Sequence, residues 1–255
     1  MNSTPTPQAP ANTTLFDTIV HGLAQAYRSA KAWQPARFDE SLSVAEAYRV
    51  QEAVGRELGW VSDGRVSAWK AGGKDSMTAA PLPLVLGSGS TWQPGATQGL
   101  LMEAEVAFRL GRTPASAADV VACISTMCVS IEMVGTRMVG GFAAPGPWKT
   151  ADQQMHGVLV VGTEIPFTPR NWAEQACTVT INGAVQAQVK GTHPNGHAPH
   201  PLPWLFEHAR ARGHDLKAGT LVTTGAWVVL QAAPGDLIEV AFEGIGGASV
   251  RVAAA

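Results

Sequence analysis

The chain has 255 residues, of which 45% are hydrophobic and 15% are charged, and its formal net charge is −2. This length supports one sizeable core or two modest domains, and the small net charge argues against nucleic acid or an anionic membrane as a main partner. Glycine, proline or charged residues interrupt every apolar run before the ~20 residues that a transmembrane helix needs. We therefore expect a compact globular protein that binds neither nucleic acid nor membranes.

Two features of the sequence indicate a location in the cytoplasm. Residues 1–14 are polar and rich in Pro, Thr and Asn, without the basic and apolar regions of a signal peptide, and are predicted to form a disordered tail. The three cysteines, Cys123, Cys128 and Cys177, lack a zinc-like CxxC spacing and cannot all pair with one another. They are expected to be buried thiols in a reducing compartment.

Residues 15–60 are predicted to form an N-terminal helical segment. Its first helix places apolar residues at helical spacing: Phe16, Ile19, Val20, Leu23, Ala24 and Tyr27. After a break at Pro35, a second helix is expected to begin at Ser43, because Ser43 and Glu46 have the spacing of a capping box. One face of this second helix carries Val44, Ala47, Tyr48, Val54 and Leu58.

Residues 61–255 have the pattern of a β-rich domain. Short runs of strand-forming residues, separated by Gly and Pro, cover 66–70, 101–110, 129–134, 156–161, 176–181, 185–189, 221–230, 237–242 and 248–252. Asn182-Gly183 lies between two of these runs and predicts a hairpin. A helix is expected over 202–212, ending at Gly213. Many strands with few helices between them predict an α+β fold, a mixed β-roll that carries the N-terminal helical segment.

Two glutamates in the run 101–110 form the first part of a candidate metal site. Strand side chains alternate between faces, so Glu103 and Glu105 share one face while Ala104 lies on the other. Their Cα atoms lie ~7 Å apart along the strand, close enough for both carboxylates to bind one hard cation such as Mg²⁺. The alternative is an ordinary half-buried antiparallel strand whose polar face is solvated.

Glu132 and Lys70 extend this candidate site. Glu132 stands alone in the apolar run 128–134, where a buried carboxylate is costly unless it meets a cation. The alternative for Glu132 is a structural ion pair with Arg137. Lys70 ends a predicted strand, where it either points inward with a pKa lowered enough by desolvation to transfer protons, or stays in solvent.

Other catalytic motifs are weak or missing in the sequence. His193, His197 and His200 invite comparison with a zinc site, but the prolines and glycine between them predict a loop near the active site, and no HExxH pattern is present. No GxSxG nucleophile elbow and no GxGxxG dinucleotide motif occur at a strand–helix junction. Serine-based hydrolysis and Rossmann-type redox chemistry are therefore not expected.

Several short motifs follow one another over nearly the whole chain. In the first half they are AYRVQ at 47–51, WKAG at 69–72, EAEVAF at 103–108 and IEMVGTR at 131–137. In the second half they are HPL at 200–202 with WL at 204–205, GHDLKAG at 213–219, LVTTGA at 221–226, PGD at 234–236 and FEGIG at 242–246. Together, in this order and spacing, they resemble the fumarylacetoacetate hydrolase superfamily, and within it the branch of 2-keto-4-pentenoate hydratases and 4-oxalocrotonate decarboxylases.

The resemblance implies an enzyme that binds Mg²⁺ or Mn²⁺ through Glu103, Glu105 and Glu132 and acts on a small 2-oxo acid. The cation would act as a Lewis acid on the substrate's 1-carboxylate and 2-oxygen. Lys70 matches the family lysine that transfers protons, and Thr224 matches a Ser or Thr position that hydrogen-bonds the substrate carboxylate. The predicted activity is hydration of a 2-hydroxydienoate in catabolism, and the family's tendency to associate implies a homo-oligomer.

The sequence departs from the pattern of this branch at two places. The acidic, glycine-containing lid that usually follows the lysine strand is replaced by 79–86, which carries no acid. The usual Ala-Asp-Asn is Ala151-Asp152-Gln153, in which Asp152 either orients water or Lys70 as a catalytic residue or is a solvated loop residue. Because both places concern substrate and water, three alternatives stay open: decarboxylation, C–C hydrolysis, and a non-catalytic family member that binds a partner.

Overall fold

The computed structural model describes residues 14–61 and 66–254, so the predicted tail lies outside the described residues except for Thr14. The α-helices of the described residues are α1 (Leu15–Ser29), α2 (Val44–Glu57), α3 (Gly146–Ala151) and α4 (Leu202–Arg210). Both α1 and α2 begin with a capping box, at Thr14 and at the predicted Ser43. No helix in this part of the chain is long and apolar enough to cross a membrane.

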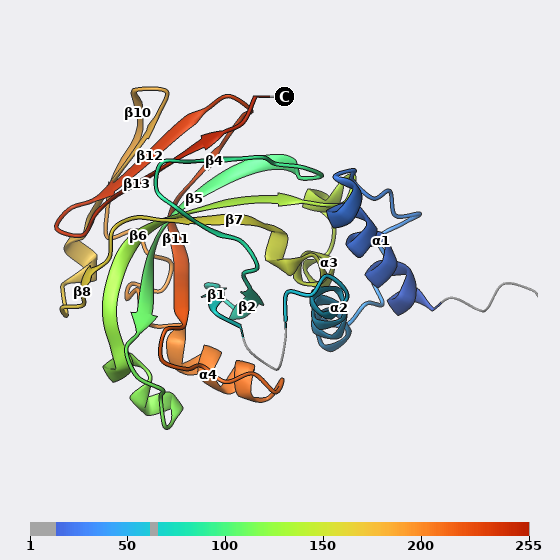
Figure 1. Ribbon diagram of the computed structural model, residues 1–255, viewed down its shortest axis with the longest axis horizontal. Coiled ribbons are helices and arrows are strands. Elements are labelled where there is room, and N and C mark those ends of the chain that lie inside the picture. Colours follow the sequence, from blue (N-terminus) through green and yellow to red (C-terminus); the bar gives the residue numbers. More distant parts are fainter. Residues whose placement is uncertain (1–13, 62–65, 255) are drawn as a thin grey trace, which may run out of the picture.

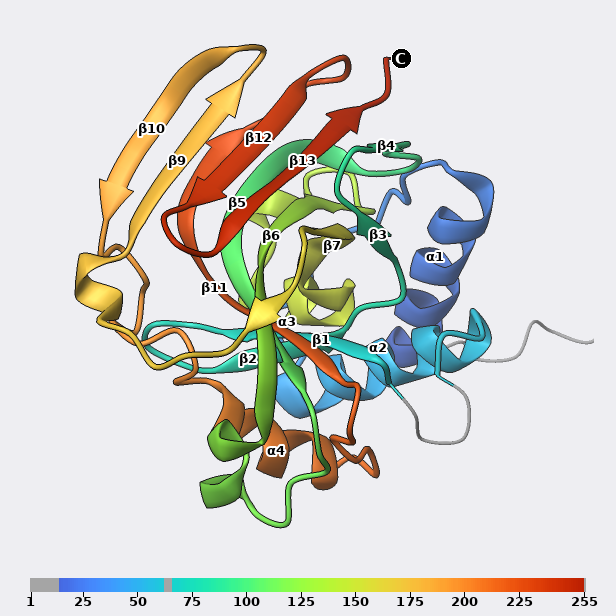
Figure 2. The same ribbon diagram turned by 60° about the vertical axis from the view of Figure 1, so that its left-hand side comes forward.

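The strands form two sheets (Figures 1 and 2). The eight-stranded sheet has the order β2-β1-β11-β5-β6-β7-β3, with β8 paired to β6, and the five-stranded sheet has the order β10-β9-β12-β13-β4. The bounds are β1 (Ala68–Gly72), β2 (Thr78–Pro81), β3 (Val85–Gly87), β4 (Ser90–Trp92), β5 (Gln98–Leu110), β6 (Ile124–Thr136), β7 (His156–Val161), β8 (Ile165–Pro166), β9 (Ala176–Ile181), β10 (Ala184–Lys190), β11 (Leu221–Gln231), β12 (Leu237–Phe242) and β13 (Gly246–Val252). Antiparallel pairs dominate, but β1–β11, β3–β7 and β4–β13 are parallel. The predicted α+β class with a mixed β-roll is confirmed.

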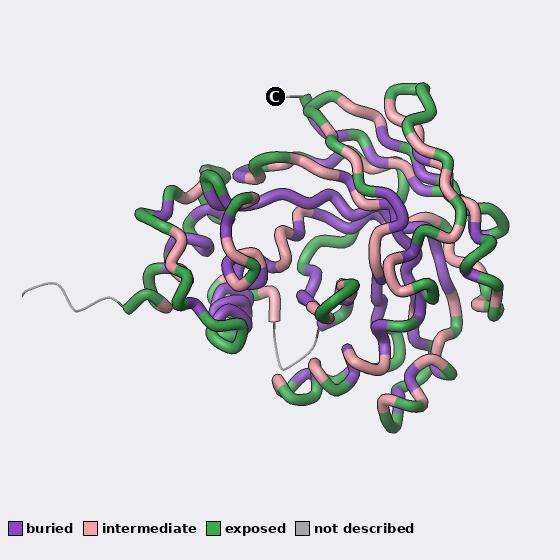
Figure 3. The backbone as a smooth tube through the Cα atoms, turned by 180° about the vertical axis from the view of Figure 1, so that it is seen from behind, coloured by how far each residue is buried: buried purple, intermediate pink, exposed green. Residues whose placement is uncertain are grey.

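The two sheets pack against each other around one large apolar core. Met102 of β5 and Ile131 of β6 belong to the same buried cluster as Val240 of β12 and Val250 of β13. Alternation along β5 and β6 turns every second side chain away from this core. The central strands are buried along most of their length, whereas β10 at the outer edge of the five-stranded sheet is largely exposed (Figure 3). Glu105 on β5 and Ser130 and Glu132 on β6 therefore lie in the interior.

A second apolar core joins the helices to the rest of the chain. Helices α1, α2 and α3 lie together on the right of Figure 1, with α4 apart from them at the lower edge. Ile19 of α1 and Val54 of α2 pack in one buried cluster with Met138 and Trp148, which follow β6 in the sequence. Val44 was expected on the buried face of α2, but it is 58% exposed because it occupies the first helical position, at the open end of the helix.

Most predicted strands are present, and the missed ones are short. The prediction named none of β2, β3, β4 and β8, each of two to four residues, and two of them contain a proline, Pro81 or Pro166. The hairpin at Asn182-Gly183 is confirmed, since both residues have positive φ and join β9 to β10. All three cysteines are buried and free, as expected.

Candidate metal centre

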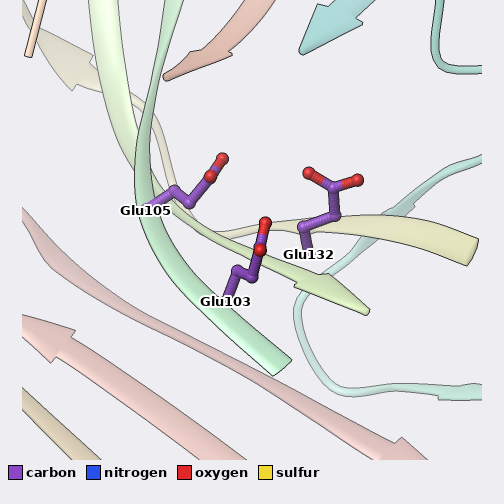
Figure 4. A group of neighbouring side chains, drawn as sticks. All are labelled: Glu103, Glu105 and Glu132. Atoms are coloured by element: carbon purple, nitrogen blue, oxygen red, sulfur yellow. The ribbon is translucent and has the colours of Figure 1, made fainter. Parts of the chain in front are cut away.

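Three glutamates meet on one face of the eight-stranded sheet. Glu103 and Glu105 lie on β5 and Glu132 lies on β6, and the antiparallel register places Glu103 directly opposite Glu132. One oxygen of each carboxylate lies within 4.8 Å of the others, and Figure 4 shows the three side chains converging on one space. The structure thus brings together the three residues that the sequence nominates as ligands, and their role as ligands stays a prediction.

The surroundings of the three carboxylates affect their charge differently. Glu132 is fully buried and Glu105 is 3% exposed, whereas 22% of the Glu103 side chain is exposed. Burial and repulsion by Glu132 raise the pKa of Glu105 well above its usual range, and burial also raises the pKa of Glu103. Burial disfavours the charge on Glu132 too, but the attraction by Lys70 and the contacts with His156 together outweigh it, and the pKa of Glu132 is lowered. Like charges placed this closely are costly unless a cation compensates them.

Lys70 lies beside the carboxylates in the middle of β1, and its side chain is only 16% exposed. Its Nζ donates to Glu132 Oε1 at 2.7 Å and lies 3.9 Å from Glu103 Oε2. The inward orientation is the first of the two predicted alternatives. The accompanying expectation of a lowered pKa is wrong for this arrangement: burial acts in that direction, but the neighbouring carboxylates outweigh it and the pKa of Lys70 is raised.

Thr223, and not the predicted Thr224, faces the carboxylates. Thr223 donates a hydrogen bond to Glu105 Oε2, and Ser130 Oγ lies 2.8 Å from Thr223 Oγ1. Since the Thr223 proton is used by Glu105, Ser130 is the donor of the second bond. Thr224 is fully buried on the opposite face of β11 and donates to the carbonyl of Val106 at 3.2 Å. Neighbouring strand residues point to opposite faces of a sheet, so Thr223 faces the carboxylates while the next residue, Thr224, faces away from them.

His156 is a site residue that the sequence analysis missed. It begins β7, its side chain is buried, and its Nδ1 lies 3.0 Å from Glu132 Oε1. A single histidine at the start of an apolar run carries no recognisable catalytic pattern. Only the pairing of β6 with β7 shows that this ring reaches Glu132.

Asp152 does not contact Lys70, and it is not solvated. It is fully buried, and its Oδ1 accepts a hydrogen bond from Arg137 Nε at 2.7 Å. Its Oδ2 accepts from Thr136 Oγ1 and from the Arg137 backbone N–H. Both oxygens are therefore used by neighbours outside the carboxylate group, and the catalytic role expected for Asp152 stays a prediction. The same contacts correct the alternative for Glu132, because Arg137 pairs with Asp152 instead.

The histidine loop lies next to the site, and both ring nitrogens of its buried member His193 are engaged in hydrogen bonds. His193 is 4% exposed, and its Nδ1 accepts the Asn195 backbone N–H while its Nε2 donates to the carbonyl of Thr224. Burial lowers the pKa of His193 to about 4, so the ring is neutral near pH 7. Gly225 must stay glycine here, because its φ is +53° and an added Cβ would lie 2.8 Å from the His193 ring.

A cavity of about 300 Å³ opens onto the charged groups Lys70, Glu103 and Glu105. The rest of its lining is uncharged: Ala71, Gly72, Gly73, Thr78, Gln154, Met155, Pro194, Gly225 and Ala226. Glu132 lies behind this lining, and its Oε2 is buried without a hydrogen-bond partner among the described residues. An all-oxygen donor set of three carboxylates with an unpartnered oxygen fits a hard divalent cation. The cavity adds room for a small molecule beside it.

The chain is similar to known proteins over most of its length. The profile of the fumarylacetoacetate (FAA) hydrolase C-terminal family matches residues 50–253. A 2-hydroxyhexa-2,4-dienoate hydratase of Comamonas testosteroni is 27% identical over 161 residues, which span 58% of this chain and 58% of that protein. The solved structure of a 4-oxalocrotonate decarboxylase from Pseudomonas putida G7, complexed with magnesium and adipate, has a TM-score of 0.80 at 19% identity, covering 94% of this chain and 100% of that one.

A second solved structure has a smaller overlap with the chain. It is a fumarylpyruvate hydrolase from Pseudomonas aeruginosa in complex with Mn²⁺ and pyruvate, with a TM-score of 0.51 at 16% identity. The match covers 74% of this chain and 89% of that one. At these identities the solved structures establish the shared fold.

Proposed function

Because the chain belongs to the fumarylacetoacetate hydrolase family, we propose that it is a divalent-metal-dependent hydratase that adds water to a 2-hydroxydienoate. The family membership confirms the resemblance seen in the sequence motifs. The observation that carries the proposal is the convergence of three carboxylates, within 4.8 Å of one another, beside a buried lysine and a cavity. Glu103, Glu105 and Glu132 would hold Mg²⁺ or Mn²⁺, in keeping with the magnesium and Mn²⁺ complexes of the similar structures.

Each residue of the site has a distinct task in this proposal. When bound, the cation supplies Lewis acidity to the carboxylate and 2-oxygen of a 2-oxo acid. Lys70 Nζ, at the cavity wall, is the group that moves the proton at the substrate carbon. Thr223 keeps Glu105 in place through its hydrogen bond, and Ser130 keeps Thr223 in place. Asp152 and Thr224 take no part, because both are fully engaged elsewhere.

The charge of the cavity lining favours hydration over decarboxylation of a dicarboxylic acid. Among the described residues that line the cavity, Lys70 is the only cation, and it is already paired with Glu132 at 2.7 Å. A second substrate carboxylate would meet uncharged residues and the two glutamates, where its desolvation is uncompensated. A substrate with one carboxylate and a short uncharged tail fits this lining better, which is the form of a 2-hydroxydienoate.

The test is an ultraviolet assay of the purified protein with Mn²⁺ and 2-hydroxypenta-2,4-dienoate, following loss of the conjugated dienol. We expect a metal-dependent loss of absorbance and a 4-hydroxy-2-oxo acid as the product. Parallel assays with a vinylogous 2-oxo dicarboxylic acid, for decarboxylation, and with an acylpyruvate, for C–C hydrolysis, test the other reactions of the family. Faster turnover of either would replace the hydratase assignment. Absence of all three reactions despite Mn²⁺ binding would indicate a non-catalytic member.

A further inference from the structure

We propose that His156 is a positioning residue that holds Glu132 by one oxygen and leaves the other oxygen to the cation. The proposal rests on the metal site proposed above and concerns how this chain prepares one of its ligands. His156 is buried, and its Nδ1 lies 3.0 Å from Glu132 Oε1. Lys70 Nζ donates to the same oxygen at 2.7 Å, so both interactions fall on Oε1.

The arrangement assigns the proton of the imidazole. An ionised carboxylate only accepts hydrogen bonds, so Nδ1 of His156 must carry the hydrogen. Nε2 is then the bare nitrogen, and it is buried without a hydrogen-bond partner among the described residues. A neutral ring with the proton on Nδ1 satisfies both statements. This is the tautomer that a histidine needs in order to orient an acidic ligand without adding a charge to the site.

Contacts of its own main chain fix the position of His156, one with the neighbouring strand β6 and one with Arg137. The main chain at His156 pairs with Val134 on β6, two residues from Glu132. Its carbonyl accepts a hydrogen bond from Arg137 Nη1 at 2.5 Å. Arg137 is fixed in turn by Asp152. The position of His156 therefore does not depend on a bound ligand.

The two oxygens of Glu132 differ in their hydrogen bonds, and this difference affects metal binding. With Oε1 occupied by two donors, the carboxylate cannot rotate freely, and Oε2 is left without a hydrogen-bond partner among the described residues. Without the imidazole, the Lys70 ammonium is free to approach both oxygens and to compete with the cation for Glu132. Partners that orient a metal ligand in this way typically change metal affinity by about 10- to 100-fold when they are removed.

The experiment compares two amide replacements of His156 by titration with Mn²⁺ alone, read by electron paramagnetic resonance. The side-chain amide nitrogen of His156→Asn takes approximately the place of Nδ1, whereas that of His156→Gln takes approximately the place of Nε2. We expect His156→Asn to bind Mn²⁺ within a few-fold of the wild type and His156→Gln to bind it about 10- to 100-fold more weakly. His208→Asn, at a histidine that stacks on Trp204 of α4, is the control and should leave the affinity unchanged.

Thermal unfolding of the metal-free variants separates positioning from folding. A merely structural His156 would lower the melting temperature in both variants without a difference in Mn²⁺ affinity between them, and that result would overturn the proposal. Equal affinity of His156→Gln and the wild type would overturn it as well. If the wild type itself bound no Mn²⁺, the metal site would be wrong and this inference with it, whereas Mn²⁺ binding without hydratase activity would leave the inference standing.

Discussion

Two groups of charged residues lie close together in this protein, and they differ in the balance of acidic and basic side chains. The first, here called the carboxylate cluster, consists of Glu103, Glu105, Glu132 and Lys70 and holds three acids against one base. The second, here called the arginine cluster, consists of Arg137 and Asp152, one base against one acid. Glu132 lies on β6 and Arg137 directly follows it. The arginine cluster is buried, whereas the side chains of Glu103 and Lys70 in the carboxylate cluster are 22% and 16% exposed.

Hydrogen bonding separates the two clusters as clearly as charge does. In the arginine cluster, Nε and both terminal nitrogens of Arg137 have acceptors, and both carboxylate oxygens of Asp152 have donors. The Arg137 guanidinium also lies 5.0 Å from the centre of the Tyr27 ring. In the carboxylate cluster, one oxygen of Glu132 has no partner among the described residues. A complete, neutral network is what a structural pair requires, whereas surplus negative charge with an unpartnered oxygen indicates a cation site.

The strongest test of this difference replaces Lys70, the basic residue of the carboxylate cluster, by an uncharged residue. Lys70→Met should retain Mn²⁺ binding and lose about 10²- to 10⁴-fold in turnover of the dienoate, because it removes the proposed proton-transfer group and leaves the carboxylates. Steady-state kinetics with saturating Mn²⁺ measures the effect. Lys74→Met, at an exposed lysine four residues further along, is the control and should stay near wild-type activity. Full activity of Lys70→Met would reduce Lys70 to a structural counter-ion.

Removing the base of the arginine cluster should instead cost stability. Arg137→Met leaves the Asp152 charge buried and uncompensated, and breaking a buried pair in this way typically costs about 3–5 kcal/mol. Chemical denaturation of the metal-free protein measures the loss. The double variant Arg137→Met with Asp152→Leu should recover part of it, because replacing both charges avoids the unpaired acid. A small loss in Arg137→Met would mean that the two clusters are less different than their contacts indicate.

Removing an acid from the carboxylate cluster should instead raise the stability of the metal-free protein. Without metal, Glu105→Gln should be more stable than the wild type, because burial and Glu132 raise the pKa of Glu105 well above its usual range. A raised carboxyl pKa means that the wild type loses stability as pH rises from the unfolded value of about 4.3 towards the folded value. The gain of Glu105→Gln should thus vanish near pH 4 and grow by up to about 1.4 kcal/mol per pH unit above it.

Mn²⁺ should reverse this order, because the cation compensates the three acids of the wild type but meets one carboxylate fewer in the variant. The wild type should gain melting temperature on adding Mn²⁺, and Glu105→Gln should gain less or nothing. Denaturation curves from pH 4 to pH 8, with and without Mn²⁺, give both comparisons. An unchanged metal effect in the variant would remove Glu105 from the site.

The parts of the fold that depend on local signals were predictable from the sequence. Capping residues such as Ser43, the Asn182-Gly183 turn and the alternation around Glu103 and Glu105 act within a few residues, so they can be read in one dimension. Short strands such as β3 were not, because β3 pairs with β7, and its partner lies far along the chain. Their own residues carry too little strand signal to identify them.

The same distinction applies to the site: residues marked by a local sequence signal could be predicted, and residues that depend on contacts between distant segments could not. The three glutamates could be nominated because a carboxylate in an apolar strand is costly wherever it lies. The choice between Thr223 and Thr224 depends on the register of β11 against β5, and the role of His156 depends on the pairing of β6 with β7. Asp152 could not be assigned to Arg137 because their contact joins the end of α3 to the residue that follows β6, 15 positions earlier in the chain. Register is a property of the folded sheet, and no local pattern in these segments specifies it.

The smallest expected effect concerns the turn between Asp152 of the arginine cluster and His156, which contacts Glu132 of the carboxylate cluster. Gln153, Gln154 and Met155 lie between Asp152 and His156, and all three have positive φ, between 52° and 60°. Left-handed backbone costs a non-glycine residue roughly 1–2 kcal/mol, so three in succession store strain beside the site. Gln154→Gly should therefore be more stable than Gln154→Ala by about 1–2 kcal/mol, the reverse of the usual preference for alanine over glycine. Both variants lose the same hydrogen bond to Thr150, so their difference in urea denaturation isolates the backbone contribution. A more stable alanine variant would show that the turn is relaxed, and that the two clusters are joined without strain.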